Sequence, residues 1–97
     1  MRTLTKKIFR EAEAGFQDKG DVLILLKPGA DGSGIQLDIQ SKVMALFGDQ
    51  IRASVLEEIT AFGLTDLIVL VRDEGALDYA IRARVATAIK RALGGEQ

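Results

Sequence analysis

The stretch at residues 41–62, SKVMALFGDQIRASVLEEITAF, has the longest helical repeat of apolar side chains in the sequence. The repeat consists of Val43, Phe47, Ile51, Val55 and Ile59, and it is widened by Met44, Leu56 and Phe62. This spacing predicts an amphipathic helix with one buried stripe. Ser41 is the expected N-cap, and Gly63 is the expected left-handed residue that ends the helix. Such a helix needs an apolar surface to pack on, which the rest of the chain must supply.

Three segments around this helix have the patterns of β-strands. Residues 22–26, VLILL, and residues 67–71, LIVLV, are continuous apolar runs of strand length, and the first is expected to be central and well buried. Residues 35–40 alternate between apolar and polar side chains, which predicts a strand with one wet face. We expect residues 22–26 and 35–40 to form an antiparallel hairpin, because their connection holds three glycines. We expect residues 35–40 and 67–71 to run parallel, because a helix between two strands normally makes a right-handed crossover.

The two ends of the chain complete the predicted fold. Residues 5–16 fit either a short charged helix or an edge strand, and the strand is favoured. The side chains that this strand would turn inward are those of Ile8, Ala12, Ala14 and Phe16. Residues 76–93 predict a second helix with Gly94 and Gly95 as its stop. Its stripe consists of Leu77, Ile81, Val85 and Ile89.

The predicted fold class follows from this order of elements. It is α+β, a small mixed sheet in the order β-β-β-α-β-α with two helices packed on one face. The length of 97 residues, with 47% hydrophobic and 28% charged residues, fits a single domain over residues 1–97 that buries a real core.

Charge and residue usage exclude several classes of function. Thirteen basic and fourteen acidic residues give a net charge of -1, which supplies no attraction to nucleic acid or to an anionic membrane. Cysteine and histidine are absent, which excludes disulfides, thiolate and imidazole catalysis and the common zinc sites. The amino terminus is too charged for a secretory signal, so we expect a cytoplasmic protein. A protein or a small molecule is the expected partner.

Several groups of residues could in principle bind an anion or a metal ion. Gly29, Gly32 and Gly34 lack the spacing of a phosphate cradle between a strand and a helix, so a hairpin loop is favoured. The acidic side chains considered as metal ligands are Asp31, Asp38, Asp73, Glu74 and Asp78. None of them lies in an ion-binding loop pattern, so we predict no metal site.

Two arginines lie off the apolar stripe of the second predicted helix. Arg82 and Arg84 could meet a phosphate or an acidic partner, as could Lys90 and Arg91 further along, although a solvated face is the simpler interpretation. Side chains two residues apart point about 200° apart on a helix, so the two arginines cannot both face one ligand. At least one is expected to pair with an internal carboxylate, and Asp78, four residues before Arg82, is the local candidate.

Short motifs occur in a defined order along nearly the whole chain. They are AG at 14–15, DKGDV at 18–22, FGDQIR at 47–52, DEGALD at 73–78 and RARV at 82–85. In this order they resemble the citrate lyase acyl carrier protein, which is the gamma subunit of its complex. A more distant resemblance is to the malonate decarboxylase acyl carrier subunit. The GALD and RARV pieces are the most specific.

The resemblance implies a carrier subunit and not an enzyme. It implies an arm of phosphoribosyl-dephospho-coenzyme A, whose thiol carries acetyl and citryl groups between two partners. These partners are the alpha (transferase) and beta (lyase) subunits of citrate lyase. On this resemblance, Asp18, Gly20 and Asp21 belong to a docking loop around the attachment position. Arg82 and Arg84 are then candidate contacts with the partner or with the phosphates of the arm.

One departure from the family pattern concerns the attachment position itself. The family has a serine whose hydroxyl bears the arm through a phosphodiester, and Lys19 stands at that position here. An amine cannot form this ester, so we expect the arm to be absent from this chain. The chain has three serines, Ser33, Ser41 and Ser54, and only Ser33 is expected on a loop that an enzyme could reach.

Tyr79 and the function of the chain each allow a further interpretation. Tyr79 stands where the family often has cysteine, and it is expected to serve packing. The alternative function is a diverged or engineered carrier-like module without prosthetic group, which binds or senses a small molecule through the sheet and the hairpin loop. No nucleophile, base and orienting group can be assembled from this residue set, and Lys19 in its polar turn is not expected to be catalytic.

Overall fold

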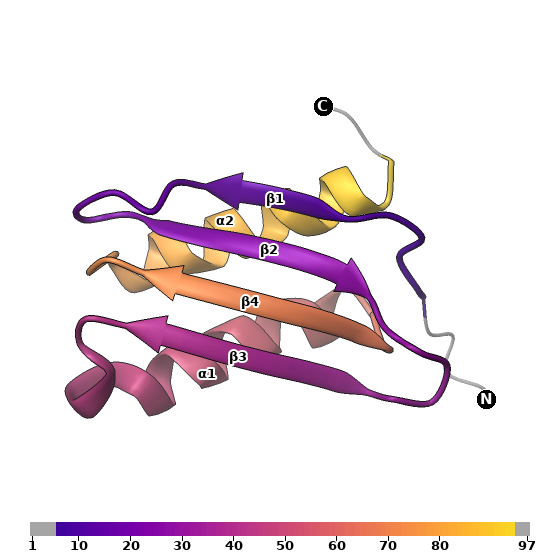
Figure 1. Ribbon diagram of the computed structural model, residues 1–97, viewed down its shortest axis with the longest axis horizontal. Coiled ribbons are helices and arrows are strands. Elements are labelled where there is room, and N and C mark those ends of the chain that lie inside the picture. The colour runs from indigo at the N-terminus through magenta and orange to yellow at the C-terminus, as the bar shows by residue number, and fades with distance from the viewer. Residues whose placement is uncertain (1–5, 95–97) are drawn as a thin grey trace.

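The computed structural model describes residues 6–94, which form a four-stranded mixed sheet with both helices on one face (Figure 1). The elements are β1 (Ala12–Gly15), β2 (Val22–Pro28), β3 (Ile35–Ser41), α1 (Met44–Ala61), β4 (Leu67–Asp73) and α2 (Asp78–Ala92). The α+β class and the order β-β-β-α-β-α are therefore confirmed. In the described part of the chain, neither helix is both long and apolar enough to cross a membrane.

The strands lie in the order β1-β2-β4-β3 across the sheet. β2 is central, as predicted, and is antiparallel to both β1 and β4. β3 is parallel to β4, which confirms the predicted parallel pairing across the helix. The predicted hairpin between residues 22–26 and 35–40 is wrong, because β4 lies between β2 and β3. β4 is apolar on both faces and takes a central place, whereas the alternating β3 tolerates an edge.

The connection between β2 and β3 is held by Asp66 and not by strand pairing. The Asp66 carboxylate accepts the backbone N–H groups of Gly32, at 3.0 Å, and of Gly34, at 2.9 Å. Both glycines have positive φ, so the three-glycine segment does form the turns that the sequence indicated. These hydrogen bonds, together with the Lys7 ammonium, hold the pKa of the Asp66 carboxyl below its ordinary value. The glycine loop therefore encloses a carboxylate of the protein itself.

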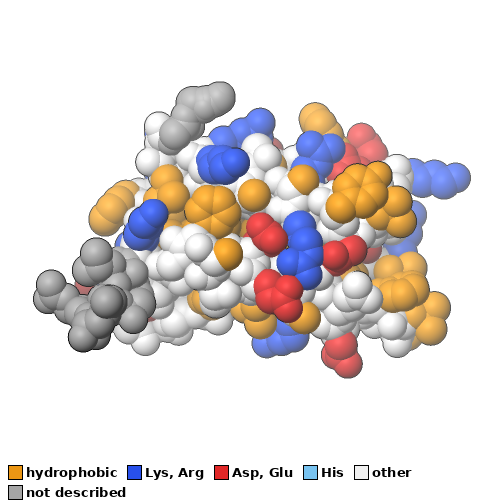
Figure 2. Space-filling view, turned by 180° about the vertical axis from the view of Figure 1, so that it is seen from behind, with side chains coloured by type: hydrophobic (Ala, Val, Ile, Leu, Met, Phe, Trp, Pro, Cys, Tyr) orange, Lys and Arg blue, Asp and Glu red, His pale blue; other side chains and the backbone are white. Residues whose placement is uncertain are grey.

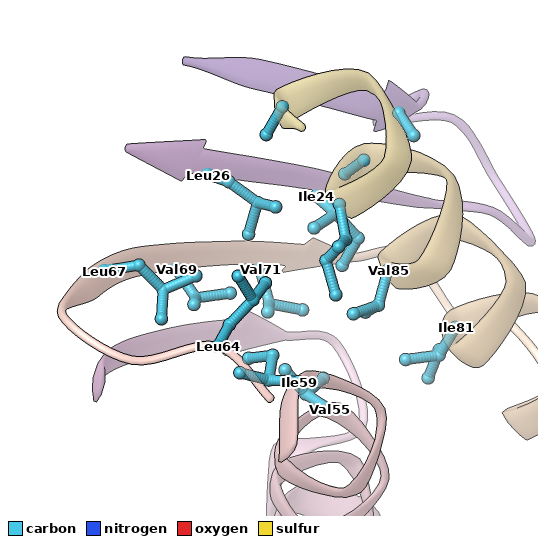
Figure 3. Close-up of a cluster of buried hydrophobic side chains, with 14 of the residues drawn as sticks. Ile24, Leu26, Val55, Ile59, Leu64, Leu67, Val69, Val71, Ile81 and Val85 are labelled. Atoms are coloured by element: carbon cyan, nitrogen blue, oxygen red, sulfur yellow. The ribbon is translucent and has the colours of Figure 1, made fainter. Parts of the chain in front are cut away.

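The core lies between the sheet and the two helices (Figure 3). From the sheet it takes Val22, Ile24 and Leu26 of β2 and Leu67, Val69 and Val71 of β4. From the helices it takes Ile51, Val55 and Ile59 of α1 and Ile81, Val85 and Ile89 of α2. The central part of each predicted helical stripe is therefore confirmed. The buried residues of β2 alternate along the strand because only one face of the sheet is covered by helices.

Both helical stripes are shorter than the sequence predicts. Phe47 and Met44 in the first turn of α1 are 50% and 45% exposed, and Leu77 just before α2 is 63% exposed. Figure 1 shows the first turn of α1 reaching past the tip of β3, where no strand covers it. Gly63 has positive φ at the end of α1, as predicted. Gly94 has positive φ after α2, while Gly95 lies outside the described residues.

The first segment of the chain is an edge strand, as favoured, but shorter than expected. Ile8 and Ala14 are buried, and Ala12 is half-buried against the core. Phe16 was expected to point inward and is 64% exposed. Gly15, with φ at 87°, ends β1 and breaks the alternation that would have turned Phe16 toward the helices.

A substitution in α1 tests the position of the core. Ile59→Ala removes a side chain that is fully buried and should lower the free energy of unfolding by about 2–4 kcal/mol, measured by urea denaturation. Leu46→Ala, on the same helix but 80% exposed, is the matched control and should change it by less than about 0.5 kcal/mol. Equal effects of the two substitutions would contradict the assignment of the buried face.

Candidate functional site

Three connections meet at one end of the sheet (Figure 1). The parallel strands β3 and β4 both end there, with Ser41 opposite Asp73. The antiparallel β2 begins there, with Val22 on the other side of Asp73. The β1–β2 turn, the β3–α1 junction and the β4–α2 loop are therefore neighbours. The end of a sheet where parallel strands have their carboxyl ends is a usual place for ligand and partner sites.

The β1–β2 connection contains a tight turn with Lys19 at its corner. The carbonyl of Asp18 accepts the N–H of Asp21 at 2.9 Å, which closes a four-residue turn. Lys19 is its second residue, and Gly20 is its third, with φ at 78°. This is the arrangement of a type II turn, which requires a glycine-like third residue. The predicted positive φ of Gly20 and the predicted exposure of the turn are confirmed, and the Lys19 side chain is exposed.

The turn is tied to the β4–α2 loop and to α2. The N–H of Gly20 donates to the carbonyl of Glu74 at 2.8 Å, and the N–H of Glu74 donates to the carbonyl of Asp21 at 2.9 Å. The Arg84 guanidinium donates twice to the Asp21 carboxylate, at 3.2 and 2.9 Å. The same carboxylate accepts the N–H of Val22 at 2.7 Å. Arg84 first, and then Val22, hold the pKa of Asp21 below its ordinary value.

A buried carboxylate joins the other two connections. Asp73 is 1% exposed, and it accepts the Ser41 hydroxyl at 2.8 Å and the N–H of Ala76 at 2.9 Å. The Ser41 oxygen also accepts the N–H of Val43 at 3.0 Å. Ser41 is thus the last residue of β3 and not the N-cap, which is Val43. The prediction failed because Ser41 still pairs with Asp73 in the sheet, so the backbone is extended there and the helix begins only at Met44.

Arg82 lies in a cluster of three carboxylates between the two helices. Its guanidinium is 2.8 Å from Asp78, 2.7 Å from Glu57 and 3.4 Å from Glu58. The predicted pairing of Arg82 with Asp78 is confirmed. The Ser54 hydroxyl donates to Asp78, and this bond, followed by Arg82, lowers the pKa of the Asp78 carboxyl. Since Arg84 pairs with Asp21, neither arginine belongs to a merely solvated face.

Two other sequence predictions are contradicted by the exposure of the side chains concerned. The Ser33 hydroxyl oxygen is buried and has no hydrogen-bond partner among the described residues, so the expectation that an enzyme could reach it is wrong. Tyr79 was expected to pack and is 73% exposed, because it projects from the first turn of α2. Within residues 6–94, no group of three or more acidic side chains is placed to hold a metal ion.

The structure adds a groove that the sequence did not predict. It lies between the first turns of α1 and α2 and has a volume of about 250 Å³. Its lining is mainly apolar and includes Val43, Phe47, Ile51, Leu77 and Ile81. Gly75 and Ala76 of the β4–α2 loop complete it, which places it beside the turn that holds Lys19. The available signal was the early start of each apolar stripe, which was interpreted as core.

Comparisons with known proteins identify the family. Residues 9–92 match the family model described as Malonate decarboxylase delta subunit (MdcD). The citrate lyase acyl carrier protein of Enterobacter sp. (strain 638) is 44% identical over 86 residues, which cover 89% of this chain and 87% of the relative. The one from Halothermothrix orenii is 36% identical over 91 residues, covering 94% and 95%. This chain belongs to the citrate lyase acyl carrier protein family. The names of these relatives describe acyl carriers and not enzymes.

A solved structure shares the fold of this chain. It is a chain of the Pseudomonas malonate decarboxylase hetero-tetramer in complex with malonate. The TM-score is 0.78 at 19% identity, and the match covers 94% of this chain and 92% of that one. At this identity the likeness establishes the fold alone. The resemblance to both carrier families, drawn from short motifs, is confirmed by the sequence comparisons.

The contact between α2 and the turn leads to a prediction. Arg84→Gln should loosen the turn, because it removes the positive charge on α2 that pairs with the Asp21 carboxylate. For a half-exposed pair worth about 0.5–1 kcal/mol, amide hydrogen exchange at Gly20 and Asp21 should accelerate by roughly two- to fivefold. Lys90→Gln, an exposed position on the same helix, is the control and should leave these amides unchanged. Unchanged exchange in Arg84→Gln would contradict the proposed tie.

Acid should remove the same tie. The stabilisation from Asp21 is fully present above the ordinary carboxyl pKa of 3.8 and is lost as the pH falls through its lower pKa in the folded protein. The difference in free energy of unfolding between the parent and Arg84→Gln should therefore shrink below pH 3.8. Urea denaturation at neutral and acidic pH measures it. A difference that is independent of pH would show that Arg84 acts through another contact.

Proposed function

We propose that this chain is the acyl carrier subunit of a citrate lyase-type complex in the cytoplasm, with alpha (transferase) and beta (lyase) subunits as partners. The observation that carries the proposal is the turn at residues 18–21. It presents position 19 at an exposed corner while Glu74 and Arg84 hold its base. A carrier needs an attachment point that other subunits can reach and that does not collapse onto the fold. This turn meets both requirements.

The residues at this turn do not fit the arm that the family resemblance implies. Phosphoribosyl-dephospho-coenzyme A joins a serine hydroxyl through a phosphodiester, and Lys19 offers an amine instead. The nearby hydroxyl of Ser41 is bonded to Asp73 and Val43 at the base of the junction. The Ser33 hydroxyl is buried in the β2–β3 connection. We therefore infer that the chain keeps the carrier fold without an ester-linked arm.

The two arginines differ in what they could contact. Arg84 lies against the turn, so it is our candidate contact for a phosphate near position 19. We propose Asp18, Gly20 and Asp21 as the docking loop around that position. Arg82 is surrounded by carboxylates, which disfavour an approaching phosphate through like-charge repulsion. We propose Arg82 as a contact for a partner protein and not for the arm.

Lys19 also supports a second candidate, a carrier-like binding or regulatory module without prosthetic group. The two candidates differ in their response to small molecules. A ligand that binds the folded state raises the melting temperature with concentration, whereas a bare carrier has no such ligand. Thermal-shift screening against carboxylates and nucleotides separates them. A concentration-dependent rise with any of these compounds would favour the sensing module.

Complex formation tests the carrier proposal. Co-expressed with the alpha and beta subunits of a citrate lyase, the chain should co-elute with them on gel filtration, because docking needs the folded surface and not the arm. The Enterobacter relative, 44% identical, is the positive control and should compete for the same subunits. Elution of the chain as a free protein of 10.5 kDa beside an assembled alpha–beta complex would overturn the proposal.

A further inference from the structure

Exposed large apolar side chains are concentrated at the end of the molecule that carries the turn. They are Phe16, Met44, Leu46, Phe47, Leu77 and Tyr79. Figure 2 shows apolar side chains gathered toward the end of the helix-covered face where both helices begin. Among the described residues, only Phe9 and Leu93 of this kind lie elsewhere. A concentration of this kind marks an interaction site, whereas single exposed apolar residues are ordinary.

The size of the groove restricts what it can hold. Its volume of about 250 Å³ is below the roughly 300–1,000 Å³ of sites for drug-sized ligands. A coenzyme A-like arm is larger still, so the groove cannot enclose it. One large side chain from another protein is a suitable occupant, since anchors of interfaces are usually single aromatic or aliphatic groups that fill a pocket. The exposed Phe47 and Leu77 at the mouth would cover such an anchor.

The surroundings of the groove carry excess negative charge. Asp78 lines the groove, and Arg82, one turn further along α2, faces three carboxylates. One positive charge against three negative charges leaves an excess of two. Figure 2 shows acidic side chains clustered around a basic one on this face. Lysine or arginine on an approaching partner would find complementary charge here, which steers association and fixes orientation.

The groove is continuous with the turn at residues 18–21. Gly75 and Ala76 form one wall of the groove, and the preceding Glu74 exchanges backbone hydrogen bonds with Gly20 and Asp21. A protein seated in the groove would therefore face position 19. A partner bound in the groove would therefore lie next to position 19 with the fold unchanged.

We propose that the groove between the first turns of α1 and α2 is the docking site for a partner subunit that inserts one aliphatic or aromatic side chain flanked by basic residues. This inference rests on the proposed carrier function and names the surface that it uses. The open face of the sheet and the β3 edge are then left free for other contacts of the complex.

Binding measurements on surface variants test the docking site. We would measure the Kd of separately purified alpha and beta subunits for the parent and for Phe47→Ser/Leu77→Ser by calorimetry. The variant should bind at least one subunit more than tenfold more weakly, because the anchor loses its apolar cover. It should keep the parental circular dichroism spectrum, because both side chains are half exposed or more. Phe9→Ser, at an 89% exposed position outside this patch, is the control and should bind within twofold of the parent.

Charge reversal provides an independent readout. Glu57→Lys should weaken binding and reduce its dependence on salt, because it removes the excess negative charge around Arg82. Glu11→Lys, at an exposed position on the first segment, is the matched control and should leave the salt dependence unchanged. A salt dependence that is the same in the parent and in Glu57→Lys would overturn the basic character assigned to the partner.

The remaining outcomes separate the docking site from the function. If the parent binds a subunit and Phe47→Ser/Leu77→Ser binds it equally well, the docking site is wrong while the carrier function stands. If the parent binds neither subunit, the carrier function fails and the docking site with it. If NMR signals of the Ile81 methyl groups shift when an arm is loaded on Lys19→Ser in the absence of subunits, the groove contacts the arm, and the partner is the wrong occupant.

Discussion

The buried carboxylate of Asp73 is the constraint on which the functional end of this protein depends. A carboxylate that is 1% exposed is costly unless its oxygens are hydrogen-bonded, and here they accept the Ser41 hydroxyl and the Ala76 N–H. The Asp73 carbonyl also accepts the N–H of Lys42 at 3.3 Å. Asp73, at the end of β4, thus fixes the position of the β3–α1 junction and the position of the β4–α2 loop. Loss of either hydrogen bond to the Asp73 carboxylate would leave a buried polar group unpaired, which typically costs about 1–3 kcal/mol.

From this constraint follow the position of the turn and its rigidity. Because the β4–α2 loop is held by Asp73, the backbone of Glu74 is available to bond Gly20 and Asp21, and Arg84 reaches the turn from the next helix. The fold thereby combines an exposed corner with a fixed base. A carrier has no bond-making chemistry of its own, so its contribution is to present one position in a defined direction. In the docking that we propose, the apolar groove beside the turn is the surface to which another subunit binds.

The helices and strands could be predicted well from the sequence, whereas the order of the strands in the sheet could not. Periodicity identified three strands and two helices and favoured a strand over a helix for the first segment. The helix between residues 35–40 and 67–71 correctly indicated parallel strands. The hairpin failed because strand order depends on competition for the centre of the sheet, which no local pattern records. The pair of Arg84 with Asp21 spans 63 positions, and the exposure of Phe47 depends on where β3 ends, so neither could be derived locally. The internal partner of Arg82 was predictable because Asp78 is four residues away on one helix.

We infer that this chain keeps the carrier fold without an arm, because Lys19 offers an amine at the attachment position, and intact-protein mass shows whether an arm is added. The parent and Lys19→Ser chains would be incubated separately with the transferase that loads citrate lyase carriers and its arm precursor. The parent should keep the mass of its sequence, and Lys19→Ser should gain the mass of one arm at residue 19. A heavier parent with the addition mapped to Lys19 or Ser33 would contradict this inference, and so would a Lys19→Ser chain that stays bare.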